Sequence, residues 1–146
     1  MKLGDIIEIE YEGKLVYLQY VKGAKSKTRL ERMRVFFEIY DERPRNIETI
    51  IKDDFFFLDF PYRHGIKENG IILIGNVPLP KDFVFPQYFR SINPFGKGWR
   101  IINDGGGQEV VEELTEEQKK LSPWGMWTIP LIFENIENGW RLENWI

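Results

Sequence analysis

The chain has 146 residues, a length that favours a single domain spanning residues 1–146 with one hydrophobic core. It contains no cysteine, which excludes disulfides, thiolate nucleophiles and cysteine-based metal sites, and its net charge of −3 argues against a dedicated nucleic-acid binder. No secretory leader is visible, and no apolar run approaches the roughly 20 residues that cross a membrane. We therefore expect a cytoplasmic protein without a membrane contact.

Residues 4–21 predict a β-hairpin. In the first half, three apolar residues alternate with three glutamates, the period-two pattern of a half-buried strand. Residues 14–21 are apolar on both faces, which is typical of a central strand. Between the halves, Glu12-Gly13 suits a tight two-residue turn because glycine readily adopts positive φ.

The middle of the chain predicts three further strands and one short helix. Residues 30–41 alternate as a third strand, and residues 53–60 form an aromatic strand that ends before Pro61. Between them, residues 46–52 predict one or two helical turns with Asn46 as the N-cap. Residues 71–75 (IILIG) are wholly apolar, and we expect this short strand deep in the core.

The three prolines of residues 77–86 exclude a central strand there. We expect this segment to wrap the surface and to insert Phe83, Val84 and Phe85. Residues 99–103 then predict a strand, and residues 108–114 either pair back to it as a hairpin or open a helix.

The C-terminal third carries the helix signals. Residues 115–121 predict a helix start, because Thr115 and Gln118 have capping-box spacing. A last helix is predicted over residues 131–138, after Pro130. Together these elements predict a mostly β (α+β) fold: a strongly bent antiparallel sheet or partly open barrel begun by the N-terminal hairpin, with short C-terminal helices.

No residue pattern points to catalysis. His64 is the only histidine, and the sequence offers few nucleophiles that could pair with it. Asp53 and Asp54 are adjacent on a predicted strand and so point to opposite faces. The glycines of residues 105–107 lack the lysine and the strand–helix context of a phosphate loop. We assign no catalytic residue, no metal site and no cofactor, and expect a protein that is not an enzyme.

Charge is spread unevenly along the sequence. Residues 22–34 hold six bases against one acid, whereas residues 104–117 hold six acids and no base. Long-range electrostatic attraction acts between patches of opposite sign. The two stretches therefore either attract partners of opposite charge or contact each other. Considered alone, the acidic stretch is best explained as a solvated face.

Several segments follow one another in an order that suggests a family. They are GDIIEIEYEGKLVYLQYV at the start, VFFEIYD at residues 35–41, IETII, IILIGNVPLP at residues 71–80, FPQYFR at residues 85–90 and the dipeptide Gly98-Trp99. In this order they resemble the immunity protein 26 family of bacterial polymorphic-toxin systems.

This resemblance implies a cytoplasmic immunity protein that binds and neutralises a cognate secreted toxin domain, such as a nuclease, by direct contact. Immunity proteins of nuclease toxins are commonly acidic, so the resemblance raises the acidic stretch to a candidate contact surface. The expected contacts are Glu109, Glu112, Glu113, Glu116 and Glu117, with Trp124 or Trp127 as an aromatic anchor.

Two other functions compete with this interpretation. The first is a nucleic-acid-binding β-barrel that uses the basic residues 22–34, namely Lys25, Lys27, Arg29, Arg32 and Arg34. The second is a small-molecule-binding barrel or an unfamiliar hydrolase, which would require a deep pocket with convergent polar groups. We rank the protein-binding function first and nucleic acid as an improbable partner.

Overall fold

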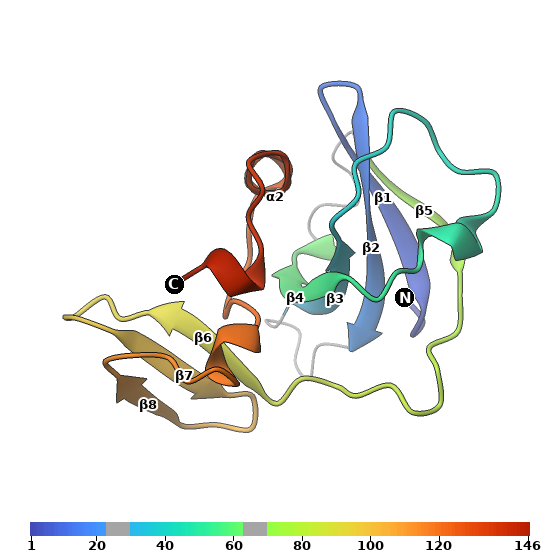
Figure 1. Ribbon diagram of the computed structural model, residues 1–146. Coiled ribbons are helices and arrows are strands. Elements are labelled where there is room, and N and C mark those ends of the chain that lie inside the picture. The colour runs from blue at the N-terminus through green and yellow to red at the C-terminus, as the bar shows by residue number, and fades with distance from the viewer. Residues whose placement is uncertain (23–29, 63–69) are drawn as a thin grey trace.

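A computed structural model describes residues 1–22, 30–62 and 70–146. Within these residues the fold is mostly β, with eight strands in two antiparallel sheets, one short α-helix and a few 3-10 turns (Figure 1). This confirms the predicted fold class, and neither sheet closes into a barrel. Within the described ranges, no helix has the length and apolar character needed to cross a bilayer.

The larger sheet has five strands in the order β4-β3-β2-β1-β5. Every neighbouring pair is antiparallel. The strands are β1 (Asp5–Tyr11), β2 (Lys14–Lys22), β3 (Glu31–Phe36), β4 (Phe55–Phe60) and β5 (Ile71–Asn76).

The N-terminal hairpin forms as the sequence predicts. Tyr11 pairs with Lys14 across the turn, so the loop holds two residues. Glu12 and Gly13 have φ of 52° and 79°, the two positive values that a type I′ turn requires. The doubly apolar β2 is the central strand of the sheet, as expected.

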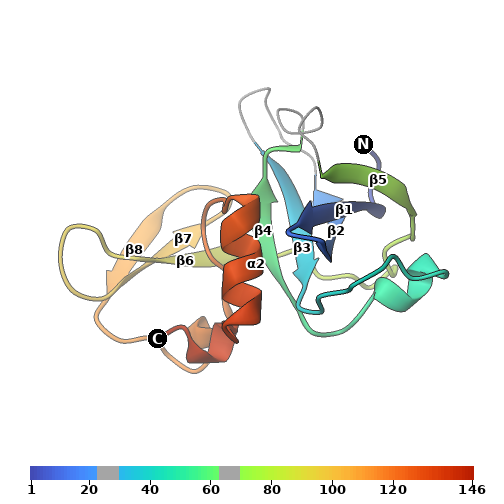
Figure 2. The same cartoon turned by 90° about the horizontal axis from the view of Figure 1, so that it is seen from above.

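One face of the five-stranded sheet packs against α2 (Ile129–Glu137). Ile132, Phe133 and Ile136 of this helix are buried against the apolar face of the strands. Figure 1 and Figure 2 show α2 between the two sheets, and the ring of its Phe133 lies 5.7 Å from that of Tyr11 in β1. The helix begins at Thr128, whose Oγ1 accepts a hydrogen bond from the Leu131 N–H at 3.3 Å. It confirms the predicted last helix.

The opposite face of the large sheet is covered by the segment between β3 and β4. This segment includes the 3-10 turn η1 (Ile47–Ile50), where Asn46 caps the N-terminus as predicted. Hydrogen bonds to Glu8, a buried carboxylate of β1, hold this segment against the sheet. Tyr17 Oη donates to Glu8 Oε2 at 2.8 Å, and Arg43 donates to both carboxylate oxygens at 2.8 and 3.0 Å. The hydrogen bonds from Arg43 lower the pKa of Glu8 against the opposing effect of burial.

The prediction that residues 71–75 lie deep in the core is wrong. They belong to β5, which is an edge strand, and Ile72 and Leu73 are 47% and 49% exposed. Ile71 alone of this strand is buried. An apolar run shows that a segment is a strand, but it does not show whether a neighbour lies on each side.

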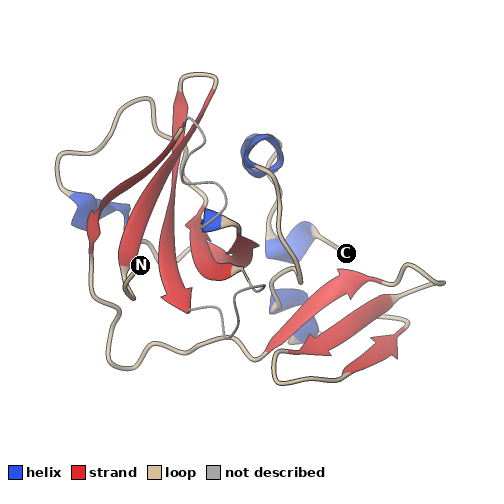
Figure 3. Ribbon diagram, turned by 180° about the vertical axis from the view of Figure 1, so that it is seen from behind, coloured by secondary structure: helices blue, strands red, loops and turns tan. Residues whose placement is uncertain are grey.

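The long connection from β5 to β6 contains no helix or strand (Figure 3). As predicted, residues 77–86 run outside the sheets, and Phe83 packs edge-on against Phe57. The expected insertion of Val84 and Phe85 is wrong, because these side chains are 81% and 45% exposed. Alternation across an irregular segment does not fix which side chains point inward.

The smaller sheet has three strands in the order β6-β7-β8, and each neighbouring pair is antiparallel. They are β6 (Tyr88–Ile92), β7 (Trp99–Asn103) and β8 (Gln108–Val111). Of the two alternatives for residues 108–114, the hairpin is the one that forms, with glycines 105–107 at its tip. The helix predicted over residues 115–121 shortens to the 3-10 turn η2 (Gln118–Lys120).

A connecting segment, residues 122–126, joins the two sheets. The Arg90 N–H of β6 donates to Ser122 O at 3.0 Å, and the Asp59 N–H of β4 donates to Gly125 O at 3.1 Å. The segment therefore pairs with one edge strand from each sheet, in the parallel sense on both sides.

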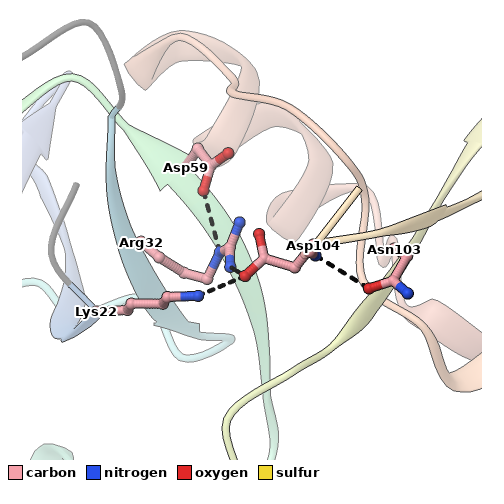
Figure 4. A network of polar contacts seen from close by, with 6 residues as sticks. Lys22, Arg32, Asp59, Asn103 and Asp104 are labelled. Carbon is pink, nitrogen blue, oxygen red and sulfur yellow. Dashed lines mark hydrogen bonds and ion pairs between the residues drawn. The ribbon is translucent and has the colours of Figure 1, made fainter. Parts of the chain in front are cut away.

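A second connection between the sheets is ionic (Figure 4). Asp104, just after β7, pairs with Lys22 of β2 and with Arg32 of β3, the latter at 3.0 Å. Arg32 also contacts Asp59 at 3.2 Å and lies 4.3 Å above the ring of Phe89. Burial raises the pKa of Asp104, but the hydrogen bonds from Arg32 and Lys22 outweigh it and lower the pKa to about 2.

Candidate protein-binding groove

A groove of about 370 Å³ lies between the three-stranded sheet and η2. It is lined by Tyr88, Ile101, Glu109, Glu117, Gln118 and Leu121. The sheet residues share one face, because Ile101 pairs with both Arg90 and Glu109 and because Tyr88 precedes Arg90 by two residues. The floor is apolar, and one glutamate comes from the sheet while the other precedes η2.

Arg90 holds the η2 wall of the groove in place. Its guanidinium donates to the backbone oxygens of Leu121 at 2.9 Å and Lys119 at 2.9 Å. It also donates to those of Leu142 and Trp145 at 2.6 Å each. Arg90 is fully buried, and this desolvation lowers its pKa to about 10. A cation on the sheet thus anchors both η2 and η3 (Leu142–Asn144) through their carbonyl groups.

The turn η2 is also fixed by the predicted capping box. The Gln118 N–H donates to Thr115 Oγ1 at 3.1 Å, and the Thr115 N–H donates to Gln118 Oε1 at 3.0 Å. This reciprocal pair orders the start of the turn, where Glu116 and Glu117 lie. The carboxylates are therefore carried by a short but well-defined backbone.

The structure places all five predicted glutamates on the surface, and two of them line the groove. Glu116 and Glu117 contact lysines three residues later at 3.0 and 3.4 Å. Exposed pairs of this kind contribute little energy, so they compete weakly with an external cation. The five predicted glutamates are Glu109, Glu112, Glu113, Glu116 and Glu117.

The two predicted aromatic anchors lie in different environments. Trp124 is 39% exposed and packs edge-on against Phe89 of β6, with ring centroids 5.4 Å apart. Trp127 packs in the core of the large sheet, 5.2 Å from Phe56 and 4.8 Å from Trp140 by ring centroids. Of the two, Trp124 offers a partner the larger surface.

Part of the basic stretch contacts the acidic stretch. Lys22 and Arg32 both pair with Asp104, so these oppositely charged ends of the two stretches meet, which was one of the two expectations. Arg32 and Arg34 are buried, and so do not form an exposed cationic row for phosphates. Lys25, Lys27 and Arg29 lie outside the described residues, as does His64.

The sequence-based reasoning missed Tyr88 and Arg90. Tyr88 is 46% exposed at the groove, and Arg90 fixes the groove's second wall. One signal was available: an arginine in a strand whose neighbouring residues are mostly apolar and aromatic must offset the cost of its burial with hydrogen bonds. Which carbonyls it would reach depends on the tertiary packing of η2 and η3.

No protein-family model, curated protein or solved structure matches this chain. We therefore argue the chemistry of the groove from its own geometry. Carboxylates beside an exposed tyrosine ring and an apolar floor match the requirements of a lysine or arginine side chain. The carboxylates accept its hydrogen bonds, the ring attracts its charge and the floor covers its aliphatic stem.

Proposed function

We propose that this protein is an immunity-type protein that binds and neutralises a secreted bacterial toxin domain by direct contact. The observation that carries the proposal is the acidic groove, with Glu109 and Glu117 on its two walls and Tyr88 beside them. The resemblance of the sequence to the immunity protein 26 family supports the same function.

The expected partner surface is basic, as in the substrate cleft of a nuclease. One lysine or arginine of the toxin domain enters the groove, and the exposed Glu112, Glu113 and Glu116 attract the surrounding positive charge. Such complementary charge raises the rate of association and selects among partners. Occupation of a basic cleft blocks the toxin because its substrate needs the same surface.

The experiment that tests this function is co-expression with the C-terminal domain of a secreted toxin, chosen from the genes that neighbour the gene for this protein. Cells that express the toxin alone are expected to stop growing, and cells that also express this protein are expected to grow. The two purified proteins should form a complex by size-exclusion chromatography. Growth arrest despite expression of the folded protein, with no complex, would contradict the proposal.

A matched pair of double variants separates the groove from overall charge. Glu109→Lys with Glu117→Lys reverses both walls, whereas Glu134→Lys with Glu137→Lys makes the same charge change on exposed positions of α2. Protection should fail in the first variant and persist in the second. Equal protection by both would exclude the groove as the contact surface.

A further inference from the structure

Arg34 is another buried arginine, and unlike Arg90 it leaves most of its side-chain hydrogen-bond donors without an acceptor among the described residues. Arg34 of β3 is 5% exposed. Its Nε donates to Gln19 Oε1 at 2.7 Å, and this is the one hydrogen bond that the Arg34 side chain makes within the described residues. Arginine has five N–H donors, so the four on Nη1 and Nη2 have no protein acceptor there.

The two Nη atoms that carry these donors are not completely sealed from solvent. In the described part of the chain, every side-chain nitrogen or oxygen that is sealed from water has a hydrogen-bond partner. The Nη groups of Arg34 have none, so they are not sealed. The arginine therefore has a buried stem and a terminal edge that is slightly exposed.

The surroundings hold this edge in one orientation. The rings of Phe36, Phe55 and Phe83 lie 5.1, 4.9 and 5.1 Å from the guanidinium carbon. Gln19 is itself fixed, because its Nε2 donates to the backbone oxygen of Val77 at 2.7 Å. The guanidinium is thus positioned before any ligand arrives, and little side-chain freedom remains to be lost on binding.

We propose that the exposed edge of the Arg34 guanidinium is a recognition site for the carboxylate of an acidic side chain on a partner polypeptide. A planar carboxylate matches the two parallel N–H donors of the fork. The partly desolvated position strengthens each charged hydrogen bond relative to one in water. This inference goes beyond the proposed toxin contact. That contact involves a basic side chain of the partner, whereas Arg34 would bind an acidic one.

Nearby charge favours a carboxylate over a phosphate. Asp53 is close enough to raise the pKa of Arg34 against the lowering effect of burial, yet the two do not form an ion pair. A dianionic phosphate would be repelled by Asp53 and by the net charge of −3 more than a carboxylate would. Because only a small part of Arg34 is exposed, a small group at the end of an unbranched side chain can reach it more easily than a bulky one.

The test is a titration of the labelled full-length protein with sodium acetate, followed by NMR of the arginine Nε and Nη signals. We expect a saturable shift of the Arg34 signals at millimolar acetate. Acetamide and sodium chloride of equal ionic strength should not reproduce it, and phosphate should bind more weakly. A shift that chloride or acetamide reproduces, or tighter binding of phosphate, would overturn the proposal.

Two variants complete the test. Arg34→Lys keeps the charge but removes the fork, so the acetate-dependent shifts of the adjacent phenylalanine rings should disappear. Asp53→Asn removes a neighbouring negative charge at an exposed position and should leave acetate affinity equal or higher. Weaker acetate binding in Asp53→Asn, or unchanged ring shifts in Arg34→Lys, would contradict the site. The wild-type titration remains decisive if Arg34→Lys does not fold.

Discussion

The five-stranded sheet is covered on both faces, whereas the three-stranded sheet leaves much of its surface to solvent. Two clusters of buried apolar residues lie on the large sheet, one beneath α2 and one beneath the segment around η1. The buried apolar residues of the small sheet are Phe89, Ile101 and Ile102, while Ile92 and Val110 are mostly exposed. The large sheet supplies most of the stability, and the small sheet's exposed residues are therefore available for recognition.

Truncation of a core side chain is the strongest test of the claim that the large sheet supplies most of the stability. Phe56 of β4 is fully buried and packs against Phe37, Trp127 and Trp140. Phe56→Ala should lower the free energy of unfolding by about 3–5 kcal/mol, because it removes a large side chain and leaves a cavity. Phe95, between β6 and β7, is 91% exposed, and Phe95→Ala should change stability by less than about 0.5 kcal/mol. Urea denaturation of both variants measures the contrast, and equal losses would refute the division.

Substitution of Arg90 tests whether its hydrogen bonds hold η2 against the small sheet. Arg90→Met should lower the free energy of unfolding by about 2–4 kcal/mol, since four backbone carbonyls lose their donor. Arg100 is a control on the next strand, because it hydrogen-bonds only one side chain, Ser91, among the described residues. Hydrogen exchange should also become faster at Leu121 in Arg90→Met. A loss no larger than that of Arg100→Met would show that Arg90 does not anchor η2.

Asp104 tests the connection between the sheets and its dependence on pH. The pKa of this carboxyl is lowered to about 2 in the folded protein, so its stabilising effect is present above its ordinary pKa near 4 and is lost as the pH falls through 2. The lowering corresponds to about 2 kcal/mol. Asp104→Asn should lose about that much stability at pH 7 and show a flatter stability curve between about pH 4 and pH 2. Parallel pH curves for the two proteins would contradict this assignment.

The strands themselves could largely be predicted from the sequence. Alternation with glutamates identified β1, and Glu12-Gly13 identified the turn, because these signals depend on neighbouring residues alone. The edge position of β5 could not be predicted, since the sequence of residues 71–75 is apolar wherever the strand lies in the sheet. The 3-10 turn η2 kept its predicted cap but extended for three residues only.

Only part of the candidate groove could be predicted from the sequence. The clustered glutamates can be seen from composition, but Tyr88 becomes their neighbour only when η2 packs over the small sheet. The same limit explains Arg32, which looked like a surface base and is instead paired with Asp59 and Asp104. Charge in a sequence shows which forces are present, and the fold decides whether they act within the protein or on a partner.

The smallest expected effect on stability belongs to the groove itself. Reversal of Glu109 and Glu117 to lysine should change the free energy of unfolding by less than about 0.5 kcal/mol, because both side chains are exposed. Thermal denaturation of this double variant beside wild type measures the change. A loss of several kcal/mol would mean that the carboxylates support the fold.

The most direct measurement of the central claim is the association rate of this protein with the toxin domain proposed as its partner, determined by stopped flow at low and high salt. For Glu109→Lys with Glu117→Lys, we predict a rate about tenfold or more below wild type at low salt, and a smaller difference at high salt. The control, Glu134→Lys with Glu137→Lys, should stay near the wild-type rate. Equal slowing in the two double variants, or none in either, would contradict a groove that receives a basic side chain.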